Sequence, residues 1–424
     1  MASAAIILLL RVPYLLAEPR MWAEEGKYFF EGAWNSNGWS SLFETYHFGY
    51  YLFYDNVVAL FTARLIPLEY APYSTMLAAW LVQLIPIAII CFGRSENWLT
   101  PTNKTIGVLA VLFTRLSGEV WLTTTSTQFH FCLVVFLLLL EPTAQCNPPC
   151  RLKYWSIRML LVVSGLTGVP SLFLTPLYYF LAWKEKERER IIQSAILTAC
   201  FIIQLSVLLL GSVPNDRFSE PGLVIYPCLL LVKNFALPLG GMRLAGEIAW
   251  NLKQIKPQGG VLPAIALLSF IAQLAFWVYW SRSLIARLRV VFIGGLLLIT
   301  FCSYLCMLAP KWGAVSALAG QRYFYVPNVI FVLLLASSLR SDKTGAGTSH
   351  IKRIAGGVLV SLAIIGGIVD YRWTAIQSPA WPQWRTEVRQ WRIDPNHLVR
   401  QWPDGWGMHW ELHLKGPVPS DPKP

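Results

Sequence analysis

Long apolar runs separated by short polar stretches recur along most of the chain. Many runs approach the roughly 17–25 residues that a helix needs to cross the hydrocarbon core of a bilayer. A membrane β-barrel would instead show short alternating segments, and none recur. The pattern predicts an all-α polytopic membrane protein with about 10 to 11 transmembrane helices. The apolar segments are 2–17, 49–67, 73–92, 105–116, 129–140, 154–183, 191–210, 261–280, 290–308, 323–339 and 354–369.

One of these segments is unusually polar. Residues 49–67 carry Asp55, Asn56 and Arg64 within an otherwise apolar run. Charged and amide side chains are costly when they face lipid, so we expect all three to face the bundle interior. A consistent topology also requires one early segment not to cross fully, and this segment is the candidate.

Two further segments depart from simple spans. Residues 154–183 are interrupted by SGLTGVP at 164–170, where Gly165, Gly168 and Pro170 predict two half-length helices meeting at a break. The mixed stretch 211–260 contains an amphipathic run, which favours an interfacial element on the outer face. A span plus a loop is the alternative for that stretch.

The same pattern divides the chain into two parts. Residues 1–370 form the predicted transmembrane domain, with a first outer loop at 18–50. Residues 371–424 are rich in proline and charge, and we expect an outer-face appendage that lies against the membrane or caps a cavity. This C-terminal segment holds seven tryptophans, Trp373, Trp381, Trp384, Trp391, Trp402, Trp406 and Trp410.

Composition and charge support the membrane interpretation. Of the 424 residues, 55% are hydrophobic and 14% are charged, against about 25% charged in soluble domains. The net charge of +12 comes partly from basic loops at 184–190 and 282–289, which indicate the cytoplasmic side rather than nucleic-acid binding. The eight cysteines lie mostly in apolar runs and imply no disulfide framework.

Candidate chemistry is concentrated in the first outer loop. Glu24 and Glu25 lie between aromatic residues directly after the first apolar segment, and a short juxtamembrane helix is expected from Glu24 to Trp34. Carboxylates partly withdrawn from water suit proton transfer. Neighbours on a helix point about 100° apart, so only one of the two can serve as a base at a given spot. The plainer interpretation is that both solvate the helix.

Other polar residues are candidates for ligand contacts. Arg322 and Tyr323 open a late apolar segment, where a guanidinium either anchors the helix at the interface or binds a phosphate. His47 is a candidate for the same phosphate. Gln128, His130 and Lys27 are candidates to line a polar cavity, although a satisfied internal contact is the alternative for the first two.

The order of these features resembles the GT-C superfamily of polytopic glycosyltransferases, which use sugars carried on polyprenyl phosphates. Over roughly residues 1–340 the layout is similar to protein mannosyltransferases and lipid A aminoarabinose transferases. The match rests on WAEEGKY at 22–28, TTTSTQFH at 123–130 and the broken segment SGLTGVPSLFLTPL at 164–177. Glu24 or Glu25 stands where the family usually has Asp, and the broken segment lacks the Lys of the family's KGP motif.

The resemblance implies a function and a set of partners. It implies an inverting transfer of sugar from a polyprenyl-phosphate donor to an envelope glycan or lipid acceptor, at the outer face of a bacterial inner membrane. Glu24 or Glu25 would be the base, and Arg322, His47 and Tyr323 would bind the donor phosphate. Some relatives use a divalent cation, which leaves that cofactor open. The alternative is a non-catalytic transporter, flippase or scaffold for lipid-linked glycans.

Overall fold

The computed structural model describes residues 1–36, 38–45, 49–115, 117–143, 151–211, 224–255, 260–306, 312–339, 350–371, 382–403 and 410–416. In these ranges the chain is almost entirely helical. Six helical segments are long and apolar enough to cross a membrane, which confirms a multi-pass, all-α membrane protein. They are Leu68–Phe92, Arg188–Leu210, Ile225–Ile255, Val261–Ser281, Ala286–Leu305 and His350–Val369.

The helices of the first half include several short turns around the first outer loop. They are α1 (Ala2–Leu10), α2 (Tyr14–Ala17), η1 (Glu25–Phe30), α3 (Glu31–Asn35), η2 (Gly38–Phe43), α4 (Phe53–Leu65), η4 (Leu68–Tyr70), α5 (Ala71–Phe92), η5 (Glu96–Trp98), α6 (Pro101–Leu112), η6 (Gly118–Val120), η7 (Thr124–Ser126), α7 (Thr127–Leu140), α8 (Arg151–Leu166), η8 (Pro170–Leu174), α9 (Thr175–Glu185) and α10 (Arg188–Leu210).

The second half holds longer helices and one small sheet. Its elements are α11 (Ile225–Leu229), η10 (Leu230–Ala236), α12 (Leu237–Ile255), α13 (Val261–Ser281), α14 (Ala286–Cys306), η12 (Gly313–Val315), α15 (Gln321–Ser337), α16 (His350–Val369), α17 (Trp384–Ile393) and the antiparallel pair β1 (Val399–Arg400) and β2 (Glu411–Leu412).

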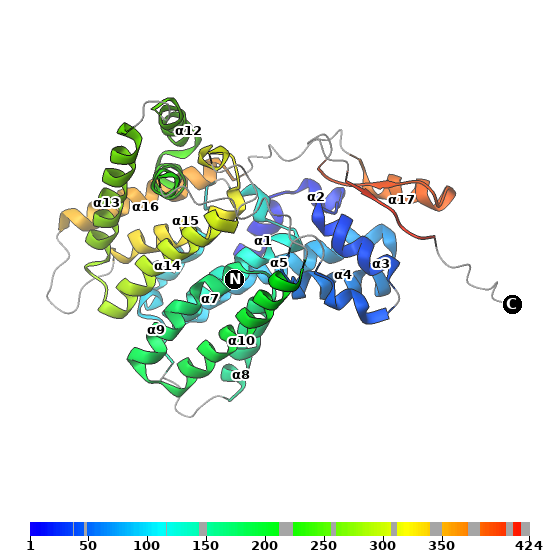
Figure 1. The fold of residues 1–424 in the computed structure, drawn as a ribbon, viewed down its shortest axis with the longest axis horizontal. Coiled ribbons are helices and arrows are strands. Elements are labelled where there is room, and N and C mark those ends of the chain that lie inside the picture. The colour runs from blue at the N-terminus through cyan, green and yellow to red at the C-terminus, as the bar shows by residue number, and fades with distance from the viewer. Residues whose placement is uncertain are drawn as a thin grey trace.

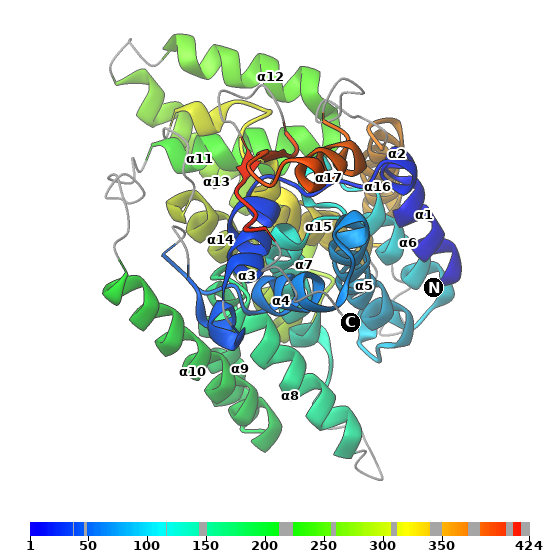
Figure 2. The same cartoon turned by 90° about the vertical axis from the view of Figure 1, so that its right-hand side faces the viewer.

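The C-terminal segment lies beside the helices of the first loop, at one end of the molecule. Figure 1 shows α3 and α4 beside α17 at one end, with α13 and α16 at the other. Figure 2 shows α12 along one edge and α8 and α10 at the opposite edge. Every residue of α7 is buried, so this helix forms the centre of the bundle.

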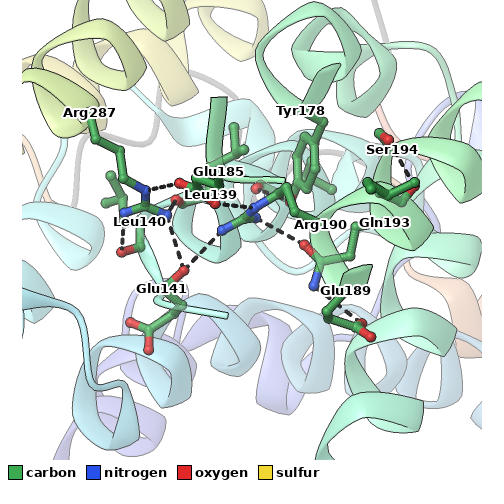
Figure 3. A network of polar contacts seen from close by, with 12 residues as sticks. Leu139, Leu140, Glu141, Tyr178, Glu185, Glu189, Arg190, Gln193, Ser194 and Arg287 are labelled. Carbon is green, nitrogen blue, oxygen red and sulfur yellow. Dashed lines mark hydrogen bonds and ion pairs between the residues drawn. The ribbon is translucent and has the colours of Figure 1, made fainter. Parts of the chain in front are cut away.

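Two arginines hold the C-terminal end of α7. Arg287 donates to the carbonyls of Leu139 (2.7 Å) and Glu141 (3.2 Å), and Arg190 donates to the Glu141 carbonyl at 3.1 Å (Figure 3). Both guanidinium groups also pair with Glu185. The last carbonyls of a helix lack intrahelical donors and carry partial negative charge, so these two cations satisfy that end of the helix.

The predicted break between two half-length helices is confirmed. The helix α8 ends at Leu166, Gly168 has a φ of 80°, and a short turn at Pro170–Leu174 leads into α9. Gln204 on α10 donates to the Leu166 carbonyl at 3.2 Å and to the Tyr51 carbonyl at 2.8 Å. A side chain from another helix therefore satisfies backbone groups that the break leaves open.

The polar segment 49–67 is a short helix rather than a full span. At 13 residues, α4 is about 20 Å long, less than the roughly 30 Å of the hydrocarbon core. Asp55 and Asn56 are buried as predicted. Arg64 is exposed and donates to the Ser36 carbonyl, so its predicted interior position is wrong. It lies in the last turn of the helix, where a long side chain reaches past the end.

The stretch 211–260 folds as α11, η10 and α12 where it is described. The helical run turns sharply at Gly241, whose φ of 71° lies in the left-handed region. Residues 225–255 are apolar and long enough to cross a membrane, which agrees with the span that was the alternative for this stretch. The rest of 211–260 lies outside the described residues apart from its two ends.

Candidate functional site

Residues 18–50, the predicted first outer loop, include the short helix that their sequence predicts. A π-helical turn, η1, runs from Glu25 to Phe30 and continues as α3 to Asn35. Ala23, just before it, has a φ of 41°, a left-handed conformation that costs free energy for a residue with a Cβ. This turn places Glu24 and Glu25 on different sides of the chain.

Glu25 points inward and anchors the loop. Its side chain is 2% exposed. One carboxylate oxygen accepts hydrogen bonds from the Thr124 backbone N–H (2.8 Å) and hydroxyl (2.9 Å), and the other accepts from the Trp22 N–H at 3.1 Å. Burial raises the pKa of Glu25, while the charge of Arg20 and these hydrogen bonds oppose the increase. Glu25 thus joins the loop to residues 117–126, which we call the connector and which lead into α7.

The connector also contains a residue with left-handed backbone. Leu122, two residues before Thr124, has a φ of 56° and is buried. Among the described residues, the only other non-glycine residues with positive φ are Ala23 and Lys186. Two of the three therefore flank the contact between Glu25 and Thr124. Strained backbone of this kind persists where surrounding contacts fix it, and such positions cluster at functional sites.

Glu24 points away from this anchor and is partly exposed. Within the described residues its side chain forms no hydrogen bond and no ion pair. Its negative charge acts on the guanidinium of Arg322, which lies in the first turn of α15 and is also partly exposed. Arg322 likewise has no ion pair with any described residue, and its guanidinium lies 5.6 Å from the ring centre of Tyr323.

The charge of a second carboxylate acts on the same guanidinium, and the sequence did not indicate this residue as part of the site. Glu119, in the connector at η6, is partly exposed, and its charge also acts on Arg322. Tyr323 packs edge-on against Phe129 with ring centres 5.6 Å apart, which holds the start of α15 against the start of α7. Glu119 is only one acidic residue in a polar connector, and nothing local distinguishes it.

We name Glu24, Glu119, Arg322 and Tyr323 the outer charged cluster, after the outer loop that the sequence predicts at residues 18–50. It combines two carboxylates and one guanidinium that come from three separate segments and remain unpaired among the described residues. Such a cluster can bind an anionic group at the arginine and accept a proton at a carboxylate. No group of three His, Cys, Asp or Glu side chains in the described part of the chain is placed to hold a metal ion.

The remaining predicted site residues that the structure describes make contacts of their own within the protein. His130 is fully buried, and one ring nitrogen lies 3.0 Å from the Val120 carbonyl. Gln128 donates to the Thr125 carbonyl at 3.0 Å and is 8% exposed. Lys27 pairs with Glu31 at 3.0 Å. His47 lies outside the described residues.

The C-terminal segment packs directly on the first loop. Gln401 donates to the Ala23 carbonyl at 2.6 Å, and the Ala23 N–H donates to the Trp402 carbonyl at 2.5 Å. Lys27 donates to the carbonyl of Glu411 at 2.7 Å. These bonds surround the strained residue before Glu24, so the segment helps to fix the conformation of the loop.

Two hollows occur at the other end of α7, near Leu140. One of about 430 Å³ is lined by residues that include Arg94 and Arg287, and one of about 620 Å³ by residues that include Arg151 and Arg158. Neither contains a residue of the outer charged cluster. Volume alone therefore points away from the chemistry, and we locate the site by its unpaired charges.

Comparisons with known proteins leave the site to be interpreted from its own geometry. No protein-family model, no curated protein sequence and no solved structure matches this chain.

Proposed function

We propose that this protein is a membrane glycosyltransferase with a GT-C-like layout. It moves a sugar from a polyprenyl-phosphate donor to an envelope glycan or lipid acceptor, with inversion at the anomeric carbon. The observation that carries the proposal is that the charge of Glu24 acts on Arg322 although the two groups form no ion pair. Both side chains are partly exposed, lie within electrostatic reach of each other and bind no described partner.

The roles of the two groups follow from their chemistry. Glu24 takes the proton from the acceptor hydroxyl or amine as that atom bonds to the anomeric carbon. The bond between that carbon and the phosphate oxygen breaks, and its electron pair leaves with the polyprenyl phosphate. Arg322 stabilises the charge that grows on this phosphate. Glu25 orients the loop that carries Glu24, and the part of a divalent cation stays open.

Basic residues support an outward-facing site. Arg190, in the basic stretch 184–190, binds the Glu141 carbonyl just beyond the C-terminal end of α7. The outer charged cluster lies at the opposite end, beside the connector that leads into α7. Because basic loops remain on the cytoplasmic side, this arrangement supports an outer position for the cluster. In a bacterium that is the periplasmic face of the inner membrane.

We also propose that the chain has ten or eleven membrane segments. Besides the six long helices, the broken pair α8–α9 and α15 add two apolar segments. The shorter apolar helices α1, α6 and α7 enter the bilayer without crossing the whole hydrocarbon core, and counting them would bring the number to eleven. The number is ten if the run from α11 to α12 lies on the outer face. Either value fits the proposed layout.

Substitution of Glu24 tests the proposal. Glu24→Gln is expected to lower sugar transfer from polyprenyl-phosphate donors in membrane vesicles by roughly 100-fold or more, a typical contribution of a general base. The matched control is Glu44→Gln, which removes an exposed carboxylate from the same loop. Full transfer by the Glu24→Gln protein would refute the assigned base. Absence of any transfer by the wild-type protein would favour the transporter or scaffold.

A further inference from the structure

A buried lysine contacts the chain on both sides of Arg322, the arginine of the outer charged cluster. Lys233 belongs to the π-helical turn η10 and is 0% exposed. Its ammonium group donates to the carbonyls of Ala317 and Ala319, at 2.9 Å and 2.6 Å. A buried ammonium without partners is strongly disfavoured, so these bonds and their geometry are important to the local structure.

The two carbonyls belong to the loop that delivers Arg322. Ala319 is followed by Gly320, whose φ of 60° allows the sharp turn into α15, and Arg322 is the second residue of that helix. The ammonium also lies 5.2 Å from the ring centre of Phe324. Lys233 therefore contacts the chain on both sides of Arg322.

The next residue strengthens this connection. Asn234 donates to the side-chain oxygen of Asn328 at 3.0 Å and accepts from the Thr300 hydroxyl at 3.3 Å. All three side chains are buried. These bonds fix the first half of α15 against η10 and α14, while Lys233 fixes the loop before it. A shift of η10 would therefore move the start of α15.

We propose that Lys233 is a positioning residue for Arg322, holding the guanidinium where it meets the phosphate of a polyprenyl-phosphate ligand. The inference rests on the proposed function, because it requires Arg322 to bind that phosphate. Lys233 itself is enclosed and does not touch the ligand. Its effect on binding passes through the loop from Ala317 to Gly320 and is therefore lost when the guanidinium is absent.

A double-mutant cycle with undecaprenyl phosphate as the probe tests this coupling. We expect Arg322→Ala to weaken binding to the purified full-length protein by roughly 10-fold to 100-fold, as for loss of a charge-assisted bond. Lys233→Met is expected to weaken binding by about 3-fold to 10-fold. The double variant should bind no more weakly than Arg322→Ala alone.

Two controls separate positioning from other effects. Lys253→Met removes a nearby charge from the same helical run, and Lys253 bonds to no described residue. We expect it to leave binding unchanged. If Lys233→Met does not fold, Lys233→Gln takes its place in the cycle, because its shorter, neutral side chain keeps a donor in the buried site but loses the charge-assisted bonds of the ammonium group, and binding is again expected to weaken.

The outcomes distinguish this inference from the proposed function. If Arg322→Ala weakens binding and Lys233→Met does not, the inference is overturned and the proposed function stands. Losses that multiply in the double variant also overturn it, because Lys233 would then act independently of Arg322. If Arg322→Ala binds as the wild type does, the phosphate role of Arg322 fails, and the inference fails with it.

Discussion

Replacement of Glu25 by glutamine separates anchoring from catalysis. Glu25 accepts three hydrogen bonds, two from Thr124 and one from the Trp22 N–H. A glutamine of the same shape keeps one carbonyl oxygen, which can retain both bonds from Thr124. Its amide nitrogen then faces the Trp22 N–H, so two donors oppose each other and that N–H loses its acceptor.

The magnitude follows from this geometry. Loss of a hydrogen bond to a charged group costs about 1.5–3 kcal/mol, and the buried Arg20 also loses the charge of Glu25. Removal of a buried charge offsets part of the second cost. We therefore expect Glu25→Gln to lower the free energy of unfolding by about 1.5–3 kcal/mol. Glu24→Gln, at a partly exposed side chain without partners, should stay within about 0.5 kcal/mol.

Unfolding in detergent, followed by tryptophan fluorescence and by loss of helix, measures both values. The Thr124→Val variant gives a second test, because it removes only the hydroxyl bond to Glu25. Its effect should become smaller in the Glu25→Gln background, where the hydroxyl bonds to a neutral oxygen, and should largely disappear in a Glu25→Ala background, where the acceptor is gone. Equal stability of wild-type and Glu25→Gln proteins would refute the anchoring role, as would a larger loss for Glu24→Gln.

Two further predictions concern buried polar groups. Burial, followed by the charge of Glu25, raises the pKa of Asp55 well above its ordinary value, and neither of its carboxyl oxygens has a described hydrogen-bond partner of good geometry. The stability that the protonated carboxyl contributes is therefore fully present below its ordinary pKa, at about pH 4, and is lost as pH rises from there through the raised pKa. Asp55→Asn should gain stability relative to the wild type over that rise, and a difference that does not change with pH would contradict this. Gln204→Leu should lower stability by about 2–4 kcal/mol and speed hydrogen exchange near Gly168, because the bonds of the helix break are lost; unchanged exchange there would contradict it.

Local chemistry explains which features of the fold were predictable. The break before α9 followed from Gly165, Gly168 and Pro170, because these residues favour a break wherever they occur together. Gln204, which satisfies the open carbonyls, lies on a different helix and has no signal of its own. The exposed position of Arg64 was missed for a similar reason, since the end of a helix cannot be located to the residue from sequence.

In the candidate site, too, the local features were predictable from the sequence and the long-range contacts were not. The helical spacing of Glu24 and Glu25 predicted that only one of them could face the reacting groups, and the structure places them on different sides. Which one points inward depended on Thr124, a residue about a hundred positions away that contacts Glu25. Glu119 reaches the site only because its connector lies beside α15, which no local pattern indicates.

Glu24 and Arg322, the two charged groups of the proposed reaction, are each held in place by a neighbouring part of the chain that another residue anchors. Glu24 has no described partner, yet its neighbour Glu25 is bound to the connector. Arg322 has none either, yet Lys233 binds the loop that leads to it. A reacting group that formed its own ion pair would have to break it when the substrate binds. An anchor on a neighbouring part of the chain fixes the position of each charge without pairing with it. Loss of either anchor should therefore impair transfer more than loss of an exposed charge nearby.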